Sequence, residues 1–117
     1  MQTKLTHVRA NVKDLEKAKE WYINYLGFQV TASWPPEKPN YIHFGSERGA
    51  TFALMESEQY PSYGRFNFDV PNVELLWEQL KGKVEIVEEL FSTPYGTKKF
   101  TIKDLDGNEL GFVQEGE

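Results

Sequence analysis

The beginning of the chain alternates between apolar and polar side chains. Over residues 4–11 the apolar Val8 and Ala10 are separated by single polar residues, which is the period of a strand with one buried face. Asp14 is a suitable N-cap for a following helix, and Gly27 is a suitable left-handed stop. Between them an apolar stripe has helical spacing and consists of Leu15, Ala18, Tyr22, Tyr25 and Leu26. The pattern therefore predicts a strand and then a helix.

Three shorter segments after this helix have the composition of strands. Turn-rich stretches at 35–39 and 45–49 separate them. The three predicted strands cover residues 28–34, 40–44 and 50–55. The first module, about residues 1–56, is thus predicted as β-α-β-β-β.

The same order of elements recurs in the second half of the chain. A linker over residues 57–64 contains the turn residues Pro61 and Gly64. The second module, about residues 65–117, is predicted to have a helix that Asn72 begins and Gly82 ends. Its predicted strands cover residues 65–70, 83–90, 98–104 and 109–114.

Apolar positions in the two halves coincide at a constant difference in residue number. This module offset is 66 − 8 = 58 for Phe66 and Val8, and it also aligns Leu110 with Phe52. Self-similarity at a fixed spacing indicates two copies of one structural unit. Because the predicted second helix is the shorter one, we expect the copies to lose register after the helices and to regain it at the last strand.

The size and composition of the chain fit one globular domain. Its 117 residues, 39% of them hydrophobic, suffice for a single cored domain over residues 1–117. The formal net charge of −5 argues against nucleic-acid binding, which uses clustered basic surface. The absence of cysteine excludes disulfides and thiolate chemistry. There is neither a membrane-spanning apolar run nor a signal peptide, so we expect a cytoplasmic protein without membrane contact.

Two segments of the chain carry a family resemblance. The opening segment consists of Leu5-Thr6-His7-Val8, Val12-Lys13-Asp14-Leu15, Trp21-Tyr22 and Leu26-Gly27-Phe28, and the closing segment is Asp104-Leu105-Asp106-Gly107-Asn108-Glu109-Leu110. Together they resemble the vicinal oxygen chelate superfamily, which includes glyoxalase I, extradiol dioxygenases, fosfomycin-resistance proteins and bleomycin-resistance proteins. The resemblance implies an α+β fold of two β-α-β-β-β modules whose curved sheets form a cup. It also implies a homodimer, because the cups of this superfamily are often shared between subunits.

Metal-dependent members of that superfamily hold a divalent cation inside the cup. Their ligands are a His or Gln on the first strand of a module and a Glu or related residue on its last strand. His7 matches the first-strand position of module one. The other three positions carry Arg65, Ala53 and Gly111, none of which is a usual ligand for such a cation. We therefore predict that the protein uses no metal and no other cofactor.

Strand alternation assigns the remaining strand residues to the cup. If the apolar residues face the helices, polar side chains that are more often cationic than anionic line the opposite face. The small Ala53 and Gly111 are expected to leave space in its middle. This lining predicts a small anionic or strongly polar ligand, for which the planar fork of Arg65 is suited. The candidate ligand-binding residues are His7, Arg9, Tyr41, His43, Arg65, Asn67 and Lys99.

Several of these residues have alternative roles. In one alternative, Arg65 binds no ligand but pairs with Glu109 or Asp69 and closes the cup. In another, His7 forms hydrogen bonds within the protein and contacts no ligand. Aromatic residues at strand ends and in loops form either a rim over the ligand or a dimer interface, and we favour the interface. These aromatic residues include Trp34, Tyr60 and Tyr63.

Three classes of function fit these features. The leading hypothesis is a metal-independent binding protein of the bleomycin-resistance type. The alternative is a glyoxalase- or dioxygenase-type enzyme, a lyase or an oxidoreductase, with a non-standard metal site around His7, His43 and Glu109. The third is a structural or regulatory protein whose cup is incidental. The sequence identifies no catalytic residue.

Overall fold

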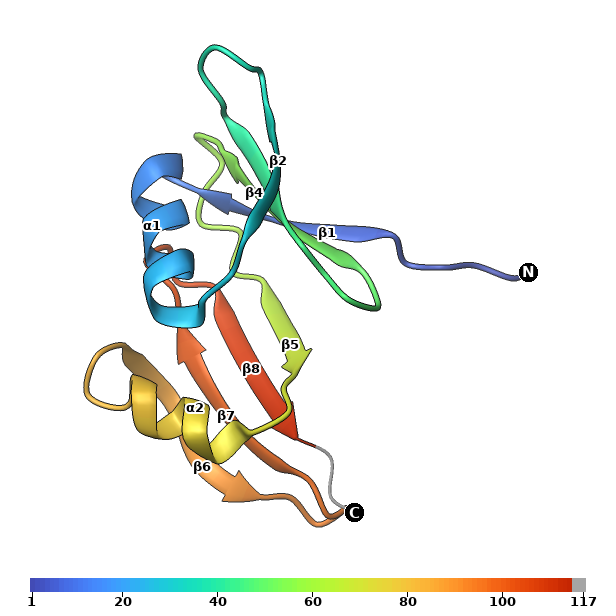
Figure 1. Cartoon of the computed structure of the whole chain (residues 1–117), viewed down its shortest axis with the longest axis vertical. Coiled ribbons are helices and arrows are strands. Elements are labelled where there is room, and N and C mark those ends of the chain that lie inside the picture. The colour runs from blue at the N-terminus through green and yellow to red at the C-terminus, as the bar shows by residue number, and fades with distance from the viewer. Residues whose placement is uncertain (115–117) are drawn as a thin grey trace. The chain divides into compact units, whose positions relative to one another are not determined.

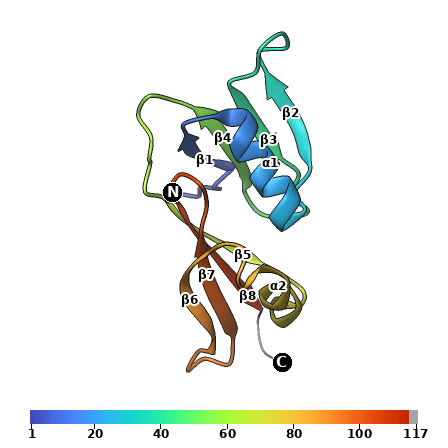
Figure 2. The same cartoon turned by 90° about the vertical axis from the view of Figure 1, so that its left-hand side faces the viewer.

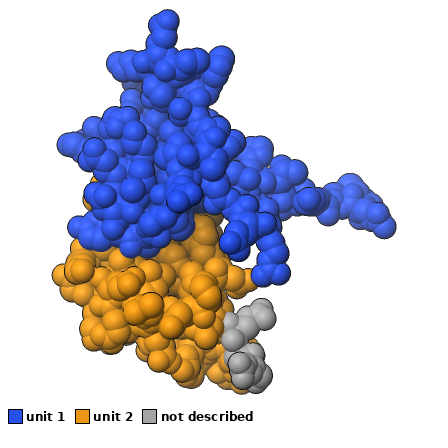
Figure 3. All heavy atoms as spheres, in the orientation of Figure 1, with its two compact units in different colours: residues 1–62 blue, residues 63–117 orange. Residues whose placement is uncertain are grey.

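The computed structural model describes residues 1–114 of the chain. The chain divides into two compact units, the first ending at Ser62 and the second beginning at Tyr63 (Figure 3). This boundary falls inside the segment 57–64 that the sequence predicts as a linker. Each unit contains one helix and a four-stranded mixed sheet, so the architecture is α+β, as predicted.

The first unit has the predicted order of elements (Figure 1). They are β1 (His7–Val12), α1 (Leu15–Leu26), β2 (Val30–Trp34), β3 (Tyr41–Phe44) and β4 (Thr51–Glu56). The strand order in the sheet is β1-β4-β3-β2, with β1 parallel to β4 and the other neighbours antiparallel. Helix α1 covers one face of this sheet, where the Tyr22 ring contacts the rings of Phe44 and Phe52.

The predicted capping residues set the limits of helix α1. The side chain of Asp14 accepts a hydrogen bond from a backbone N–H of the first turn at 3.1 Å, and Gly27 has a φ of 69° after the last turn. The N–H of Phe28 then bonds back to the carbonyl of Tyr22, and the two rings stack. Because Phe28 is part of this helix end, β2 begins at Val30 and not at residue 28 as predicted.

The second unit repeats the arrangement (Figure 2). Its elements are β5 (Arg65–Asp69), α2 (Val73–Leu80), β6 (Glu85–Ser92), β7 (Lys98–Lys103) and β8 (Glu109–Gln114). The strand order is β5-β8-β7-β6, with β5 parallel to β8. The rings of Trp77 and Phe100 lie 5.3 Å apart, so Phe100 is on the face that α2 covers.

The two ends of helix α2 differ in how well the sequence predicts them. Asn72 caps the first turn as predicted, and its Oδ1 accepts a hydrogen bond from the N–H of Leu75 at 3.1 Å. The helix already ends at Leu80, and the C-cap Lys81 has an extended backbone. Gly82 has a φ of 80°, so the predicted left-handed turn follows the helix without capping it. Within the described residues, neither helix is long and apolar enough to cross a membrane.

The module offset is restored at the third strand of each unit. Tyr41 pairs with Met55 in the first unit, and their counterparts at the same offset, Lys99 and Val113, pair with each other in the second. The prediction that register returns only at the last strand was therefore wrong. Register shifts interrupt the pairing of β2 with β3 and of β6 with β7, so the copies differ mainly around these edge strands.

Candidate ligand-binding faces

Each sheet has one face covered by its own helix and an opposite face, which we call its helix-free face. In the first sheet Val8 pairs with Phe52, and Arg9 pairs with Ala53. Because Phe52 contacts the helix residue Tyr22 and side chains alternate along a strand, Arg9 and Ala53 belong to the helix-free face. This division follows the predicted alternation.

Arg9, Ala53 and His43 form one row across the helix-free face of the first sheet. Ala53 pairs with Arg9 on β1 and with His43 on β3. Ala53 has no exposed surface, whereas Arg9 is exposed. Within residues 1–114 no carboxylate forms an ion pair with Arg9. The row therefore places a guanidinium and an imidazole on either side of a small residue.

Tyr41 and His43 contact each other beside this row. The Tyr41 hydroxyl lies 3.3 Å from Nδ1 of His43, and the two rings meet edge to face. Trp34 pairs with Tyr41 across β2 and β3, and 64% of its surface is exposed. A half-buried polar pair thus lies next to an exposed aromatic side chain.

His7 is the first residue of β1 and is exposed. Its Nδ1 lies 3.2 Å from the hydroxyl oxygen of the preceding Thr6. This contact with Thr6 orients the His7 ring through Nδ1. The other ring nitrogen, Nε2, takes no part in it. His7 is therefore suited to a polar contact, and the local hydrogen bond also fits the alternative of a residue without a ligand.

Arg65 forms an ion pair with Glu109 in the second unit. Its Nη1 lies 3.2 Å from Oε1 of Glu109, and the side chains are 52% and 33% exposed. The two residues are direct neighbours in the parallel pairing of β5 with β8. Of the two roles predicted for Arg65, the structure thus contains the internal pair with Glu109.

Asn67 and Lys99 meet over Gly111 on the helix-free face of the second sheet. A Cβ on Gly111 would overlap with Oδ1 of Asn67 and would lie 3.2 Å from Cε of Lys99. The expectation that Gly111 leaves open space was therefore wrong, because the Asn67 amide occupies it. The sequence could not reveal this, since it depends on a side-chain rotamer.

Two buried polar atoms on the helix-free faces have no hydrogen-bond partner among the described residues. They are Oδ1 of Asn11 and Oγ1 of Thr101. The Asn11 Nδ2 donates to the carbonyl of Gln59, and its backbone N–H donates to the hydroxyl of Ser62. Strand alternation assigned Asn11 and Thr101 to the cup, but only the structure shows that these atoms are buried and unsatisfied.

The structure brings the predicted residues together in two groups. Arg9, Tyr41 and His43 lie in neighbouring positions of the first sheet, and Asn67 and Lys99 lie together in the second. His7 and Arg65 begin the equivalent strands β1 and β5 of their units.

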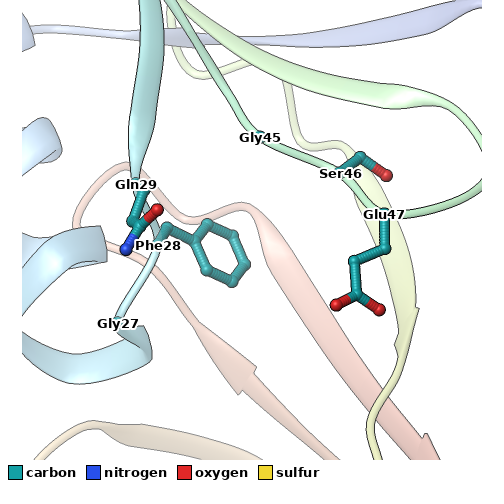
Figure 4. Close-up of a pocket in the computed structure, with 6 residues that line it drawn as sticks. All are labelled: Gly27, Phe28, Gln29, Gly45, Ser46 and Glu47. Carbon is teal, nitrogen blue, oxygen red and sulfur yellow. The ribbon is translucent and has the colours of Figure 1, made fainter.

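A pocket of about 390 Å³ lies elsewhere in the first unit, at the end of helix α1 (Figure 4). It is lined by Gly27, Phe28, Gln29, Gly45, Ser46 and Glu47. None of the predicted binding residues belongs to it. The Phe28 ring on its wall packs against Tyr22 and Phe44.

The residues at the superfamily's metal positions do not fit a divalent cation. Ala53 and Gly111 have no donor in their side chains, and Arg65 contributes a positive charge. Within residues 1–114 no group of three or more His, Asp or Glu side chains could hold a metal ion. His7 alone supplies too few donors for zinc or for a harder cation.

The family model of the Glyoxalase/Bleomycin resistance protein/Dioxygenase superfamily matches residues 4–112 of the chain. The protein therefore belongs to this superfamily, which confirms the resemblance of its opening and closing segments. No curated protein matches the chain in sequence.

Several solved structures share the fold. TioX from Micromonospora sp. ML1 has a TM-score of 0.83 at 15% identity, covering 97% of this chain and 99% of that one. TnmS3, an antibiotic binding protein from Streptomyces sp. CB03234, has a TM-score of 0.81 at 22% identity and covers 98% of both chains. Lactoylglutathione lyase from Agrobacterium tumefaciens has a TM-score of 0.77 at 15% identity, covering 97% and 94%. At these identities the similarity concerns the fold.

Proposed function

We propose that the protein binds a small anionic or strongly polar organic molecule on its helix-free faces, without a metal ion and as a homodimer. The observation that carries this proposal is the row of Arg9, Ala53 and His43. Arg9 presents a guanidinium with no ion-pair partner among residues 1–114. A guanidinium binds carboxylates and phosphates through two parallel hydrogen bonds.

Neighbouring side chains support an organic ligand over a simple inorganic anion. The Tyr41 and His43 pair adds groups that both donate and accept hydrogen bonds. Trp34 adds an exposed aromatic surface beside them. TnmS3, which has the same fold, is an antibiotic binding protein, and this supports a binding role for the fold without naming the ligand.

The structure changes the residue that we expect to bind the anion. Arg65 is partly neutralised by Glu109 at 3.2 Å, so its guanidinium is a weaker anchor than one without a carboxylate neighbour. We therefore propose Arg9 as the main anchor in the first unit, with His7 as a secondary contact there, and Arg65 as a weaker contact on the second unit.

The enzyme alternative requires a metal site around His7, His43 and Glu109. Glu109 is engaged by Arg65, and Nδ1 of His43 is engaged by Tyr41. A metal would have to displace one of these contacts. A lactoylglutathione lyase has the same fold, and measuring the metal content of the purified protein tests the enzyme alternative directly.

A thermal-shift screen tests the proposed function. The probes are benzoate and phenyl phosphate, with benzyl alcohol as the neutral analogue, on the wild type and on Arg9→Gln. A ligand that binds only the folded state raises its apparent stability. We expect both anions to stabilise the wild type, benzyl alcohol to have no effect, and Arg9→Gln to reduce the response. Equal responses to charged and neutral probes would contradict the proposal.

Lys13→Gln is the matched control, because Lys13 is also an exposed cation near the end of β1 but lies over the Tyr60 ring. The control variant removes one positive charge from the same part of the chain. If it weakens binding as much as Arg9→Gln does, the effect comes from net charge and not from the proposed site.

A further inference from the structure

The helix-free face of the second sheet contains a buried hydroxyl group without a partner. Thr101 pairs with Gly111 on β8 and with Glu88 on β6, so it lies within the sheet and not at its edge. Its neighbour Phe100 contacts Trp77 of α2, which places Thr101 on the opposite face. Thr101 has no exposed surface, and its Oγ1 has no hydrogen-bond partner in residues 1–114.

A buried hydroxyl without a partner is unfavourable, because it has lost its hydrogen bonds to water. Valine has nearly the shape of threonine and would avoid this loss. The hydroxyl at position 101 therefore has a structural cost for the free protein that a ligand could remove. Such groups in folded proteins require a specific explanation.

Lys99 supplies a positive charge beside this hydroxyl. It lies two residues before Thr101 on the same face of β7, and its Cε is 3.2 Å from the position of a Cβ on Gly111. Four other cations of the second unit are paired with carboxylates, namely Lys81 with Glu78, Lys98 with Glu74, Lys103 with Glu85 and Arg65 with Glu109, and Lys83 is not paired within residues 1–114. Within residues 1–114 no carboxylate forms an ion pair with Lys99.

Asn67 and Lys99 lie over Gly111, which is the neighbour of Thr101 on β8. Gly111 has no side chain of its own to hold them in place. Asn67 is exposed and Lys99 is partly exposed, so each can rotate toward solvent. An anion that reaches the Thr101 hydroxyl from this face would therefore lie beside the Asn67 amide and the Lys99 side chain.

We propose that Thr101 and Lys99 form an oxyanion subsite that binds the carboxylate or phosphate group of a ligand, with the Asn67 amide beside it. The Thr101 hydroxyl donates a hydrogen bond to one oxygen, and the Lys99 ammonium donates to another. Hydrogen bonds from a cation to an anionic oxygen are stronger than those between neutral groups. This inference rests on the proposed function, because it assumes that anions bind to the helix-free faces.

The test uses binding of inorganic phosphate, phenyl phosphate and benzoate to the full chain, measured by calorimetry. Thr101→Val removes only the hydroxyl, Thr101→Ser retains it, and Lys99→Met removes the charge. We expect Thr101→Val and Lys99→Met to weaken binding about tenfold or more, as for loss of a hydrogen bond to a charged group. Thr101→Ser is expected to retain most of the affinity. Ser33→Ala is the control, because it removes an exposed hydroxyl from the edge strand β2.

Proton–nitrogen NMR spectra recorded during the same titrations locate the bound anion independently. We expect the backbone signals of Thr101 and Gly111 to shift first. A response to phosphate alone would assign the subsite to phosphate groups, and a response to benzoate alone would assign it to carboxylates.

Two outcomes separate failure of this inference from failure of the proposed function. If the anions bind the wild type and Arg9→Gln weakens them while Thr101→Val does not, the subsite is wrong and the proposed function stands. If no anion binds the wild type, the proposed function and the subsite are both wrong. Should Thr101→Val fail to fold, unchanged affinity in Lys99→Met together with unshifted signals for Thr101 and Gly111 would overturn the subsite.

Discussion

The carboxylate of Glu56 accepts a hydrogen bond from the backbone N–H of Leu15 at 3.0 Å. The last strand of the first unit thus supplies a hydrogen-bond acceptor for a backbone N–H in the first turn of helix α1. The same contact recurs at the equivalent positions of the second unit, where Oε1 of Gln114 accepts from the N–H of Val73 at 2.8 Å. The repeat therefore extends beyond apolar spacing to the hydrogen bonds that join each helix to its sheet.

Removing these acceptors should destabilise the protein. We expect Glu56→Leu and Gln114→Leu each to lower the free energy of unfolding by about 0.5–2 kcal/mol, the range for loss of a helix N-terminal cap. Glu56→Gln keeps an acceptor oxygen and should lose less. Urea unfolding followed by circular dichroism measures the change. Equal losses for Glu56→Leu and Glu56→Gln would mean that charge, and not the hydrogen bond, is responsible.

The ion pair between Arg65 and Glu109 should contribute little to stability. Both side chains are partly exposed, so solvent screens their attraction. A double-mutant cycle with Arg65→Gln and Glu109→Gln should give a coupling energy of about 0.2–1 kcal/mol in urea unfolding. The coupling should decrease in high salt. A much larger value that salt does not affect would indicate that the pair is shielded from water.

Two glycines of the second unit should respond differently to alanine. A Cβ on Gly64 would lie 2.5 Å from Cζ of the Phe66 ring, so this ring would have to move. We expect Gly64→Ala to lower the free energy of unfolding by about 1–3 kcal/mol, as for overpacking. Gly111→Ala mainly displaces the exposed amide of Asn67 and should lose less. Thermal unfolding of both variants gives the comparison, and the reverse order would contradict it.

The purified protein should contain no stoichiometric divalent metal. Three of the four positions that hold the metal in metal-dependent members of the superfamily carry Arg65, Ala53 and Gly111. Elemental analysis after purification without a chelator measures the content. One zinc, nickel, manganese or iron ion per chain, lost in His7→Ala, would favour the enzyme alternative.

We predict a homodimer on the basis of exposed aromatic side chains. Trp34 is 64% exposed and Tyr63 is 79% exposed, and such residues are enriched at protein interfaces. Light scattering at micromolar concentration should give twice the mass of the chain. A monomer for the wild type would contradict the prediction, and a dimer that survives Trp34→Ser would place the interface away from Trp34.

Local patterns predict most of the fold, because strand alternation, helical spacing and the caps Asp14 and Asn72 depend on a few neighbouring residues. The end of α2 was less predictable, since Gly82 takes its left-handed conformation two residues after the helix ends. The site was harder still. The choice of Glu109 as the partner of Arg65 depends on the register of β5 with β8, and the position of Asn67 depends on a rotamer.

The parallel pairing of first and last strands also affects the order of folding during synthesis. His7 pairs with Thr51, and Arg65 pairs with Glu109, so each pairing joins distant parts of its unit (51 − 7 = 44 and 109 − 65 = 44). Such a loop has a large entropy of closure, and contacts between distant residues slow folding. During synthesis β1 leaves the ribosome before β4, and β5 leaves before β8. Each of these first strands therefore remains without its parallel partner until the last strand of its unit has emerged. The first sheet can therefore be completed only after residue 56 has left the ribosome.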